Sequence, residues 1–355
     1  MGGEETKVEL SPIIKKFIIK IPKVSPEVFL NDERSNFKRT KEEILKNFNI
    51  TIEKIDSEAL KKITEIISKE TEEIIKNKEV ELGVIVRNKE IIYADLESEI
   101  KKIYGIAIDL GTTKIAIYLM DLETGKTIDT FAIMNPQIAY GEDVISRLKY
   151  VLENKNGRNK LRNIAIKKIN EIIRDICKKN NVNKDQIFEV VAVGNTAMHH
   201  LLLGLPIKQL ALLPFKSVIT GEVEIKARDF ELDINKFGYI YFPPPIAAFV
   251  GSDNLAMILS SKIFEKEGNV LGIDIGTNTE IVLKTDNVIT CCSTASGPAF
   301  EGAHIKYGMR ASEGAIDGVV IEPDNLNIMI STIDNYPPVG ICGSGILDAV
   351  AEMLK

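Results

Sequence analysis

Two short stretches of the chain follow the same local plan: "GIAIDLGTTK" at residues 105–114 and "GIDIGTNTE" at residues 272–280. In each, an apolar run after Gly-Ile carries an aspartate near its end, Asp109 or Asp274. Gly and Thr follow the aspartate, and the chain then continues as another apolar run. Such runs predict buried β-strands, and the glycine between them predicts a tight turn. Each stretch is therefore predicted to be a hairpin whose first strand brings a carboxylate to the turn.

The residues after each hairpin extend the repeat. Residues 104–133 contain three strand-like runs joined by two turns, and residues 269–295 show the same pattern. This predicts an antiparallel meander in both places. After the first meander, apolar residues recur at helical spacing through residues 161–176, and a strand-like run follows at 188–194. We therefore expect an α/β protein with two related halves.

The patterns divide the chain into four predicted parts. Residues 1–49 are expected to be a linker, and residues 50–103 a small β-α-β-β domain. Residues 104–270 form the first half of the duplication. Residues 271–355 form the start of the second half, which is much shorter, so we expect it to be incomplete.

Both turns suit phosphate. Successive backbone N–H groups and hydroxyls make a concave set of donors at Gly111, Thr112 and Thr113, and likewise at Gly276, Thr277 and Asn278. An aspartate beside such a turn would repel phosphate, so we expect a Mg²⁺ ion between them, held mainly through water. A Rossmann or P-loop site is disfavoured because there the glycine turn opens a helix, whereas here it opens a strand. One such turn alone would be an ordinary structural hairpin.

The pair of turns resembles the two phosphate loops of the actin-like ATPase superfamily, in which duplicated ribonuclease-H-like domains clamp Mg-ATP. The segment "VVAVGNTAMHHLLLG" is similar to the connection between such domains, with Gly194 allowing close approach at the hinge. The superfamily includes acetate and sugar kinases, actin and the seventy-kilodalton chaperones.

Further motifs narrow the resemblance to the ATPase portion of the reductive activators of corrinoid proteins. They are "NPQIAYGEDVISRL" at 135–148, "PPPIAAFVGSDNLAMIL", "ASGPAFEGAHIKYGMRASEGAI" at 295–316 and "GICGSGILDAVAEML". Members of that family use ATP to drive the reduction of cobalt(II) in a corrinoid protein to cobalt(I).

The resemblance implies roles for particular residues. Asp109 and Asp274 would handle Mg²⁺ and the attacking water as catalytic residues. The phosphates would be held by the two turns, and Gly194 and Gly297 would lie near the nucleotide. ATP and Mg²⁺ are the implied cofactors, and a corrinoid protein is the implied partner.

Two departures from the family pattern bear on function. The four cysteines lack the spacing of an iron–sulfur cluster, so we expect no cluster on this chain and a separate iron–sulfur electron donor. The glycine-rich adenosine-binding segment of a second half is missing, so we expect a truncated product, a split gene or a second chain. A small-molecule kinase of the same fold and a non-catalytic scaffold are the alternatives, and a homodimer is one assembly left open.

Composition excludes other classes. The chain has 45 Lys and Arg against 51 Asp and Glu, a net charge of −6, with no large basic block, so nucleic acid is not an expected partner. No apolar stretch is long enough to span a bilayer, so no membrane association is expected. The acidic start lacks a secretory signal, and we expect a cytoplasmic protein.

Several polar residues have structural interpretations beside functional ones. The adjacent His199 and His200 cannot bind one metal together on a helix, so packing or capping is expected. Cys291 and Cys292 are expected to be buried thiols. Asp253 is either the N-cap of a helix or a site residue. The same choice between structure and site stays open for Glu301 and Arg310, whereas His304 is expected to be structural.

Overall fold

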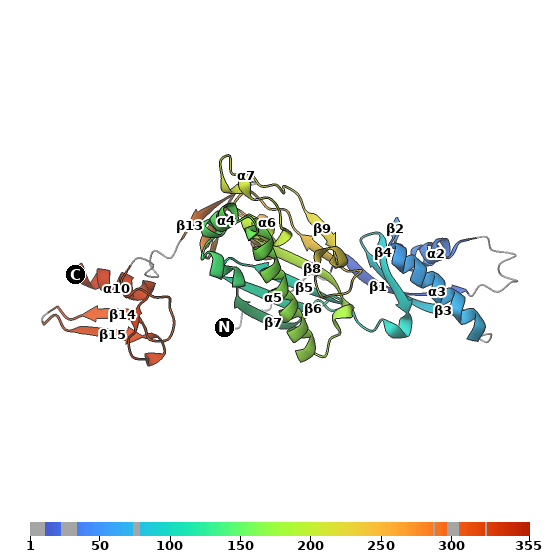
Figure 1. Cartoon of the computed structure of the whole chain (residues 1–355), viewed down its shortest axis with the longest axis horizontal. Helices are drawn as coiled ribbons and strands as arrows, with labels where there is room; N and C mark the ends of the chain where they lie inside the picture. Colours follow the sequence, from blue (N-terminus) through green and yellow to red (C-terminus); the bar gives the residue numbers. More distant parts are fainter. Residues whose placement is uncertain (1–10, 23–33, 74–78, 287, 297–304, 324) are drawn as a thin grey trace. The chain divides into compact units, whose positions relative to one another are not determined.

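The computed structural model describes residues 11–22, 34–73, 79–286, 288–296, 305–323 and 325–355. The chain divides into two compact units, unit 1 (Met1–Ser260) and unit 2 (Ser261–Lys355). Figure 1 labels many of their helices and strands. Among the described helices, none combines the length and the apolar character needed to cross a membrane.

The small domain of unit 1 is a four-stranded sheet covered by two helices. The strands lie in the order β1-β3-β4-β2. The apolar sides of the sheet and the helices form one core, which includes Ile44, Ile63 and Leu82. The bounds are β1 (Ile14–Pro22), α2 (Asn36–Phe48), β2 (Lys54–Ile55), α3 (Ser57–Glu73), β3 (Glu79–Arg87) and β4 (Glu90–Leu96), followed by the short η1 (Glu97–Glu99).

The stretch expected to be a linker contributes to this domain. Strand β1 pairs antiparallel with β3 along its whole length, from Ile14 opposite Arg87 to Pro22 opposite Glu79. Helix α2 begins at an N-cap, Ser35, whose hydroxyl accepts from the Lys38 N–H at 3.2 Å. The described part of the predicted linker is thus structural, because β1 buries Ile19 and Ile21 in the core of the small domain.

The rest of unit 1 is a six-stranded sheet in the order β7-β6-β5-β8-β10-β9. Strands β5, β6 and β7 form the predicted antiparallel meander, and β8 joins β5 in parallel. Strand β10 continues in parallel with β8, and β9 closes the sheet antiparallel. This strand order, with an antiparallel meander followed by parallel strands, is the ribonuclease-H-like arrangement expected from the sequence. The strands are β5 (Tyr104–Leu110), β6 (Lys114–Asp121), β7 (Thr127–Met134), β8 (Ile187–Gly194), β9 (Val223–Lys226) and β10 (Tyr239–Phe242).

Helices cover one face of this sheet. The long helix α5 runs beside the strands in Figure 1 and buries its predicted apolar side, including Leu161, Ile169 and Ile173, against them. Strand β5 contributes Ile106, Ile108 and Leu110 to the same core. The helices are η2 (Pro136–Tyr140), α4 (Val144–Glu153), α5 (Gly157–Lys179), η3 (Lys184–Gln186), α6 (Thr196–Leu203), α7 (Lys208–Ala211), α8 (Ala227–Phe230) and α9 (Ser252–Ser261).

A buried ion pair joins the small domain to the six-stranded sheet. Arg87, at the end of β3, donates through Nε to Glu189 at 2.7 Å and through Nη2 at 2.9 Å, and both side chains are almost fully buried. Nη2 also reaches Glu224 on β9 at 2.9 Å. Burial alone would lower the pKa of Arg87, but the two carboxylates outweigh it and raise that pKa. Arg87 therefore stays charged and links three strands.

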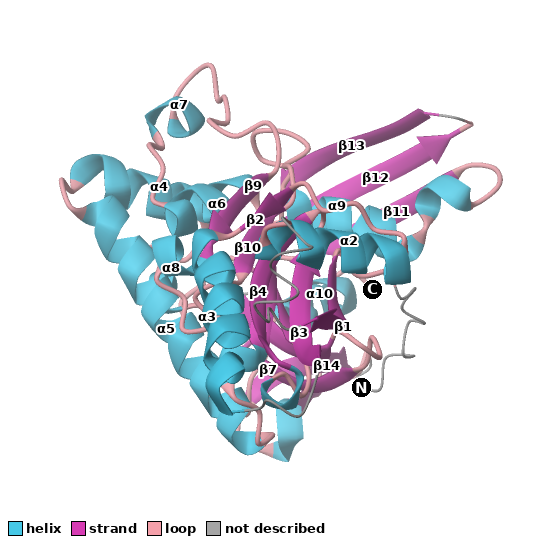
Figure 2. Ribbon diagram, turned by 90° about the vertical axis from the view of Figure 1, so that its right-hand side faces the viewer, coloured by secondary structure: helices cyan, strands magenta, loops and turns pink. Residues whose placement is uncertain are grey.

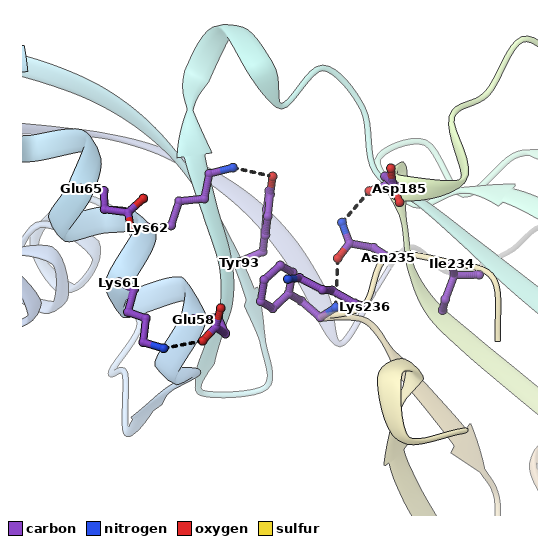
Figure 3. Close-up of a pocket in the computed structure, with 10 residues that line it drawn as sticks. Glu58, Lys61, Lys62, Glu65, Tyr93, Asp185, Ile234, Asn235 and Lys236 are labelled. Carbon is purple, nitrogen blue, oxygen red and sulfur yellow. Dashed lines mark hydrogen bonds and ion pairs between the residues drawn. The ribbon is translucent and has the colours of Figure 1, made fainter. Parts of the chain in front are cut away.

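A surface pocket of about 480 Å³ lies beside this joint (Figure 3). Helix α3 provides Lys62, which donates to Tyr93 at 3.2 Å, and the loop before β10 provides Asn235. Asn235 donates to the Asp185 carbonyl at 2.7 Å. Lys61 likewise donates to Glu58 at 2.7 Å, and the apolar side chains of Ile234 and Phe237 complete part of the lining.

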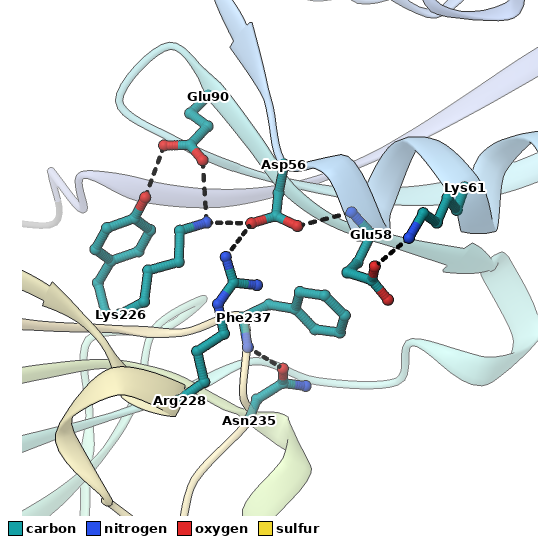
Figure 4. Close-up of polar contacts among 9 residues, drawn as sticks. Asp56, Glu58, Lys61, Glu90, Lys226, Arg228, Asn235 and Phe237 are labelled. Carbon is teal, nitrogen blue, oxygen red and sulfur yellow. Dashed lines mark hydrogen bonds and ion pairs between the residues drawn. The ribbon is translucent and has the colours of Figure 1, made fainter.

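A second polar cluster extends the joint (Figure 4). Lys226 donates to Asp56 and, at 3.1 Å, to Glu90, while Arg228 reaches Asp56 at 3.2 Å. Burial alone would raise the pKa of Asp56, but the hydrogen bond from Lys226 helps to hold it below its usual value. Together with Arg87, these contacts hold the small domain and the first half in one unit.

Unit 2 repeats the meander and adds a second small sheet. Strands β11 (Val270–Ile275), β12 (Asn278–Thr285) and β13 (Val288–Ala295) are antiparallel neighbours, and Figure 2 shows them side by side. In the other sheet, β14 (Ala315–Ile321) lies between β15 (Ile328–Thr332) and β16 (Gly340–Ile341). Helix α10 (Gly343–Met353) packs on β14, where its Asp348 accepts from the Val319 N–H at 3.4 Å. The short helices η4 (Ile263–Glu265) and η5 (Ile333–Asn335) complete the unit.

Removing Arg87 should destabilise unit 1. In Arg87→Met, the Glu189 carboxylate stays buried without its cation, so we expect the free energy of unfolding to fall by about 3–5 kcal/mol. Urea denaturation at pH 7 measures it. As a control, Lys20→Met breaks an exposed pair with Glu81 and should cost about 0–1 kcal/mol. If Arg87→Met lowered the free energy of unfolding by no more than Lys20→Met does, the joint would be unimportant for stability.

Candidate functional site

The first predicted loop, residues 109–113 (loop 1), lies where β5 turns into β6. Alternation along β5 puts Asp109 on the face opposite the core, where its side chain is exposed and Ala116 is its partner on β6. The turn needs Gly111, since a Cβ there would lie 2.5 Å from the Lys114 carbonyl oxygen. Local geometry thus presents a carboxylate next to a turn that only glycine can make.

The carbonyl groups of loop 1 are bound from one side by the segment 135–147. Asn135 donates through Nδ2 to the Gly111 carbonyl at 2.9 Å and through its backbone N–H to the Thr113 carbonyl at 2.8 Å. The guanidinium of Arg147 donates to the Thr112 carbonyl. In a planar trans peptide the C=O and the following N–H point in opposite directions. The N–H groups of Thr112 and Thr113 therefore point to the opposite side of loop 1 from these donors.

Gly194 lies beside loop 1. It ends β8 opposite Leu110, and a Cβ on it would lie 2.9 Å from the Leu110 carbonyl oxygen. Its N–H donates to the Ser252 hydroxyl at 3.3 Å. A Cβ on Gly251 would lie 2.1 Å from the Gly194 carbonyl oxygen. Two backbone segments therefore meet at contact distance only because both residues are glycine.

The start of α9 also determines the position of Asp253. The helix begins at Ser252, so Asp253 lies in its first turn, and its Oδ1 accepts from the Asn254 N–H at 2.8 Å. The N-cap interpretation of Asp253 is therefore wrong, because the cap position comes before the first helical residue.

The second loop, residues 274–278 (loop 2), lies between β11 and β12 in unit 2. Asp274 is exposed, and its partner across the ladder is Glu280, a second carboxylate that is buried and accepts from the Ser293 hydroxyl at 3.1 Å. A Cβ on Gly276 would lie 3.1 Å from the Asn278 carbonyl oxygen, a tight but smaller conflict than at Gly111. The two loops thus share a plan and differ in the residue opposite the aspartate.

Comparison with known proteins identifies the family to which the chain belongs. Models described as "RACo middle region" and "C-terminal domain of RACo the ASKHA domain" match residues 104–266 and 268–355. A solved structure of a reductive activator for corrinoid, iron–sulfur protein superposes with a TM-score of 0.78 at 34% identity, covering 98% of this chain and 54% of that one. The chain belongs to the RACo family.

Two curated relatives agree with this assignment. The RACo-family chain is 39% identical over 275 residues to the corrinoid activation enzyme RamQ of Eubacterium limosum, covering 77% of this chain and 46% of RamQ. It is 31% identical over 284 residues to the [Co(II) methylated amine-specific corrinoid protein] reductase of Methanosarcina barkeri, covering 71% of this chain and 51% of that protein. The chain spans about half the length of these relatives. The predicted family and the actin-like ATPase fold are confirmed.

The other predicted site residues have different outcomes in the RACo-family chain. Gly297, Glu301 and His304 lie outside the described residues. Arg310 is exposed in the segment before β14. Within the ranges given above, no group of three His, Cys, Asp or Glu side chains is placed to hold a metal ion. The pocket of Figure 3 contains none of the predicted site residues.

The expectation that Cys291 and Cys292 are buried thiols is wrong. Cys291 is only half-buried, and Cys292 is exposed. They are consecutive residues of β13, so their side chains point to opposite faces of the sheet.

The adjacent histidines are packing residues. His199 and His200 are fully buried in α6. The Nδ1 of His200 donates to the Thr196 carbonyl at 2.7 Å while its Nε2 accepts from the Val218 N–H at 3.1 Å, which requires the neutral ring. His199 Nε2 contacts the Ser252 hydroxyl at 3.2 Å. Burial lowers the pKa of His200 and lowers that of His199 to about 4.

Sequence reasoning assigned no role to three residues that contact or support loop 1: Asn135, Gln137 and Arg147. The motif that contains them, residues 135–148, indicates the family resemblance but no role for these three side chains. The sequence does contain a signal, because the polar side chains of Asn135, Gln137 and Arg147 need hydrogen-bond partners if they are buried. Which carbonyls it binds depends on a contact 24 to 35 residues away along the chain.

His199 should make the RACo-family chain less stable at mildly acid pH. Its folded pKa of about 4 lies below the unfolded value of about 6.5, so the unfolded state binds more protons between these values and stability falls as pH falls. From pH 7 to pH 5 we expect His199 to account for a loss of about 2 kcal/mol in urea denaturation. His199→Gln should flatten that slope, and an unchanged slope would contradict the assignment.

Proposed function

We propose that this chain binds Mg-ATP through loops 1 and 2 and uses it to promote the reduction of cobalt(II) in a corrinoid protein. The observation that carries the proposal is the geometry of loop 1. Three consecutive carbonyls are bound on one side, so the intervening N–H groups face the other side, next to the exposed Asp109.

The residues present fit a nucleotide phosphate. Phosphate groups are bound by backbone N–H groups in tight turns, and Gly111 keeps the turn free of a side chain. Thr112 and Thr113 add hydroxyl donors, and in loop 2 Gly276, Thr277 and Asn278 offer the same chemistry. A hard cation such as Mg²⁺ prefers oxygen ligands and keeps several waters, so Asp109 and Asp274 would hold it mainly through water.

The groups would divide the work. Asp109 and Asp274 would hold the hydrated cation and orient the attacking water, and the two turns would bind and position the phosphates. When bound, Mg-ATP supplies binding free energy and a phosphoryl group for hydrolysis. Gly194 would serve as the hinge, at the place where it and Gly251 let the end of β8 pack closely against the start of α9. Gly297 would lie near the nucleotide.

The partner assignment rests on the relatives. RamQ is named a corrinoid activation enzyme and the solved structure a reductive activator for corrinoid, iron–sulfur protein, and the family model of residues 268–355 is that of an ASKHA domain. A ligand shifts a conformational equilibrium only by its difference in affinity for the two states. ATP binding would therefore favour the state of this chain that holds the corrinoid protein in its reducible form, while an iron–sulfur donor supplies the electron.

Mg-ATP binding should depend on both aspartates. In calorimetric titrations of the chain, Asp109→Ala and Asp274→Ala should each weaken binding at least tenfold, about 1.4 kcal/mol, because each removes a ligand of the hydrated cation. Chelation of Mg²⁺ by EDTA should have a similar effect on the wild type. Asp129→Ala is the matched control, since Asp129 on β7 forms a surface pair with Lys179 and should not affect binding. Absence of binding by the folded wild type would overturn the proposal.

ATP should also change the interaction with a corrinoid protein. With a cobalt(II) corrinoid protein and a low-potential one-electron donor, we expect cobalt(I) to accumulate only when Mg-ATP and this chain are both present. Each cobalt(II) takes one electron, and the donor loses one. Absorbance spectroscopy follows the conversion, and a titration with and without nucleotide gives the change in affinity. If ATP alters neither reduction nor affinity, the corrinoid assignment fails; release of ADP that depends on a metabolite would instead support a small-molecule kinase.

A further inference from the structure

The support of loop 1 is centred on one buried arginine. Arg147, in α4, is fully buried, and so is Gln137, while Asn135 is almost so. The guanidinium of Arg147 donates to the Thr112 carbonyl in loop 1. The same side chain donates through Nε to the Gly141 carbonyl at 2.8 Å and through Nη1 to Gln137 Oε1 at 3.4 Å. The planar guanidinium of Arg147 thus connects loop 1 to Gln137 and Gly141.

The neighbours of Arg147 are themselves fixed. Gln137 donates through Nε2 to the Leu161 carbonyl in α5 at 3.1 Å, and its N–H is bound by Asn135 Oδ1 at 2.9 Å. Nη1 of Arg147 also contacts the sulfur of Met198 in α6 at 3.2 Å. The position of Thr112 is therefore determined by contacts to three helices of the core.

The acceptors bound by Arg147 are unusual for a buried cation, because they are neutral. Buried charges are normally paired with an opposite charge, as Arg87 is with Glu189. The hydrogen-bond acceptors of Arg147 described here are two carbonyls, an amide oxygen and a thioether sulfur. Burial lowers the pKa of Arg147 to about 10, an effect opposed by the Asp143 carboxylate, so the group is charged near pH 7. A positive charge thus lies directly behind loop 1.

We infer that Arg147 is the positioning residue of loop 1 for the phosphates of ATP. Its hydrogen bond fixes the direction of the Thr112 carbonyl. This orients the N–H of Thr113, in the same peptide unit, toward the opposite side of the loop. The charge of Arg147 adds to the positive potential that an anion meets there, because its hydrogen-bond partners are neutral and a charge in a low-dielectric interior is little screened; the nearby Asp143 carboxylate offsets part of this potential. The inference rests on the proposed binding of Mg-ATP by loop 1.

The test compares Arg147→Met with Arg147→Lys in calorimetric titrations of the full chain with Mg-ATP and with Mg-tripolyphosphate. Met removes the charge and the hydrogen bonds, and we expect at least tenfold weaker binding of both ligands, since the effect is on the phosphates. Lys keeps the charge and should recover part of the loss, to about threefold. Arg162→Met is the control, because Arg162 in α5 also donates to a backbone carbonyl, that of Phe230, at 3.4 Å. It should leave both affinities unchanged.

A second measurement does not depend on how well the variants fold. Hydrogen exchange of the wild-type peptide that contains residues 108–116 should slow when Mg-ATP or Mg-tripolyphosphate binds. Thermal unfolding of each variant separates loss of fold from loss of binding, and Arg147→Lys provides a folded case if Arg147→Met does not.

Each outcome discriminates between the two proposals. If the wild type binds Mg-ATP and a folded Arg147→Met binds it equally well, the inference is overturned while the proposed function stands. Protection of residues 108–116 together with weakened binding in the variants supports both. If the wild type binds neither ligand, the proposed function fails and the inference fails with it.

Discussion

Strand β5 is the element on which the rest of the first half depends. It lies in the middle of the six-stranded sheet, and it buries Ile106, Ile108 and Leu110 against the helices. Because side chains alternate along a strand, this burial forces Asp109 onto the opposite face, where it is exposed. A shift of one residue in register would bury the carboxylate and expose three aliphatic side chains. The hydrophobic effect on one face of β5 thus determines where the acid of loop 1 points.

Strand β8 connects this loop to the small domain. Near its start it carries Glu189, the buried partner of Arg87, and at its end it carries Gly194, which contacts loop 1. The joint and the loop are therefore separated by one paired strand. The strand is hydrogen-bonded to β5 on one side and to β10 on the other, and the Arg87–Glu189 pair attaches its start to the small domain.

The two loops are similar but not identical. Asp109 has Ala116 across the ladder, while Asp274 has the carboxylate of Glu280. Like charges on directly opposite residues of a sheet repel each other, which a cation or a hydrogen-bond donor offsets. Ser293 supplies one donor to Glu280 at 3.1 Å. Loop 1 is instead associated with the positive charge of Arg147, so the electrostatic surroundings of the two aspartates differ although their local sequences agree.

Periodicity alone predicted the two meanders and the helix at 161–176, because alternation and helical spacing are local properties of an element. It placed Asp109 and Asp274 near the ends of their strands, and the structure shows that both side chains are exposed. Short motifs identified the family, since the glycines and the threonines occur where a tight turn needs them. The sequence did not show that residues 14–22 join the small sheet, because pairing with β3 is a contact between distant segments. It also did not show which carbonyls Asn135 and Arg147 bind, or that Arg87 pairs with Glu189. Those partners lie 24 to 102 residues apart, and packing of the whole domain brings them together, so only the tertiary structure decided them.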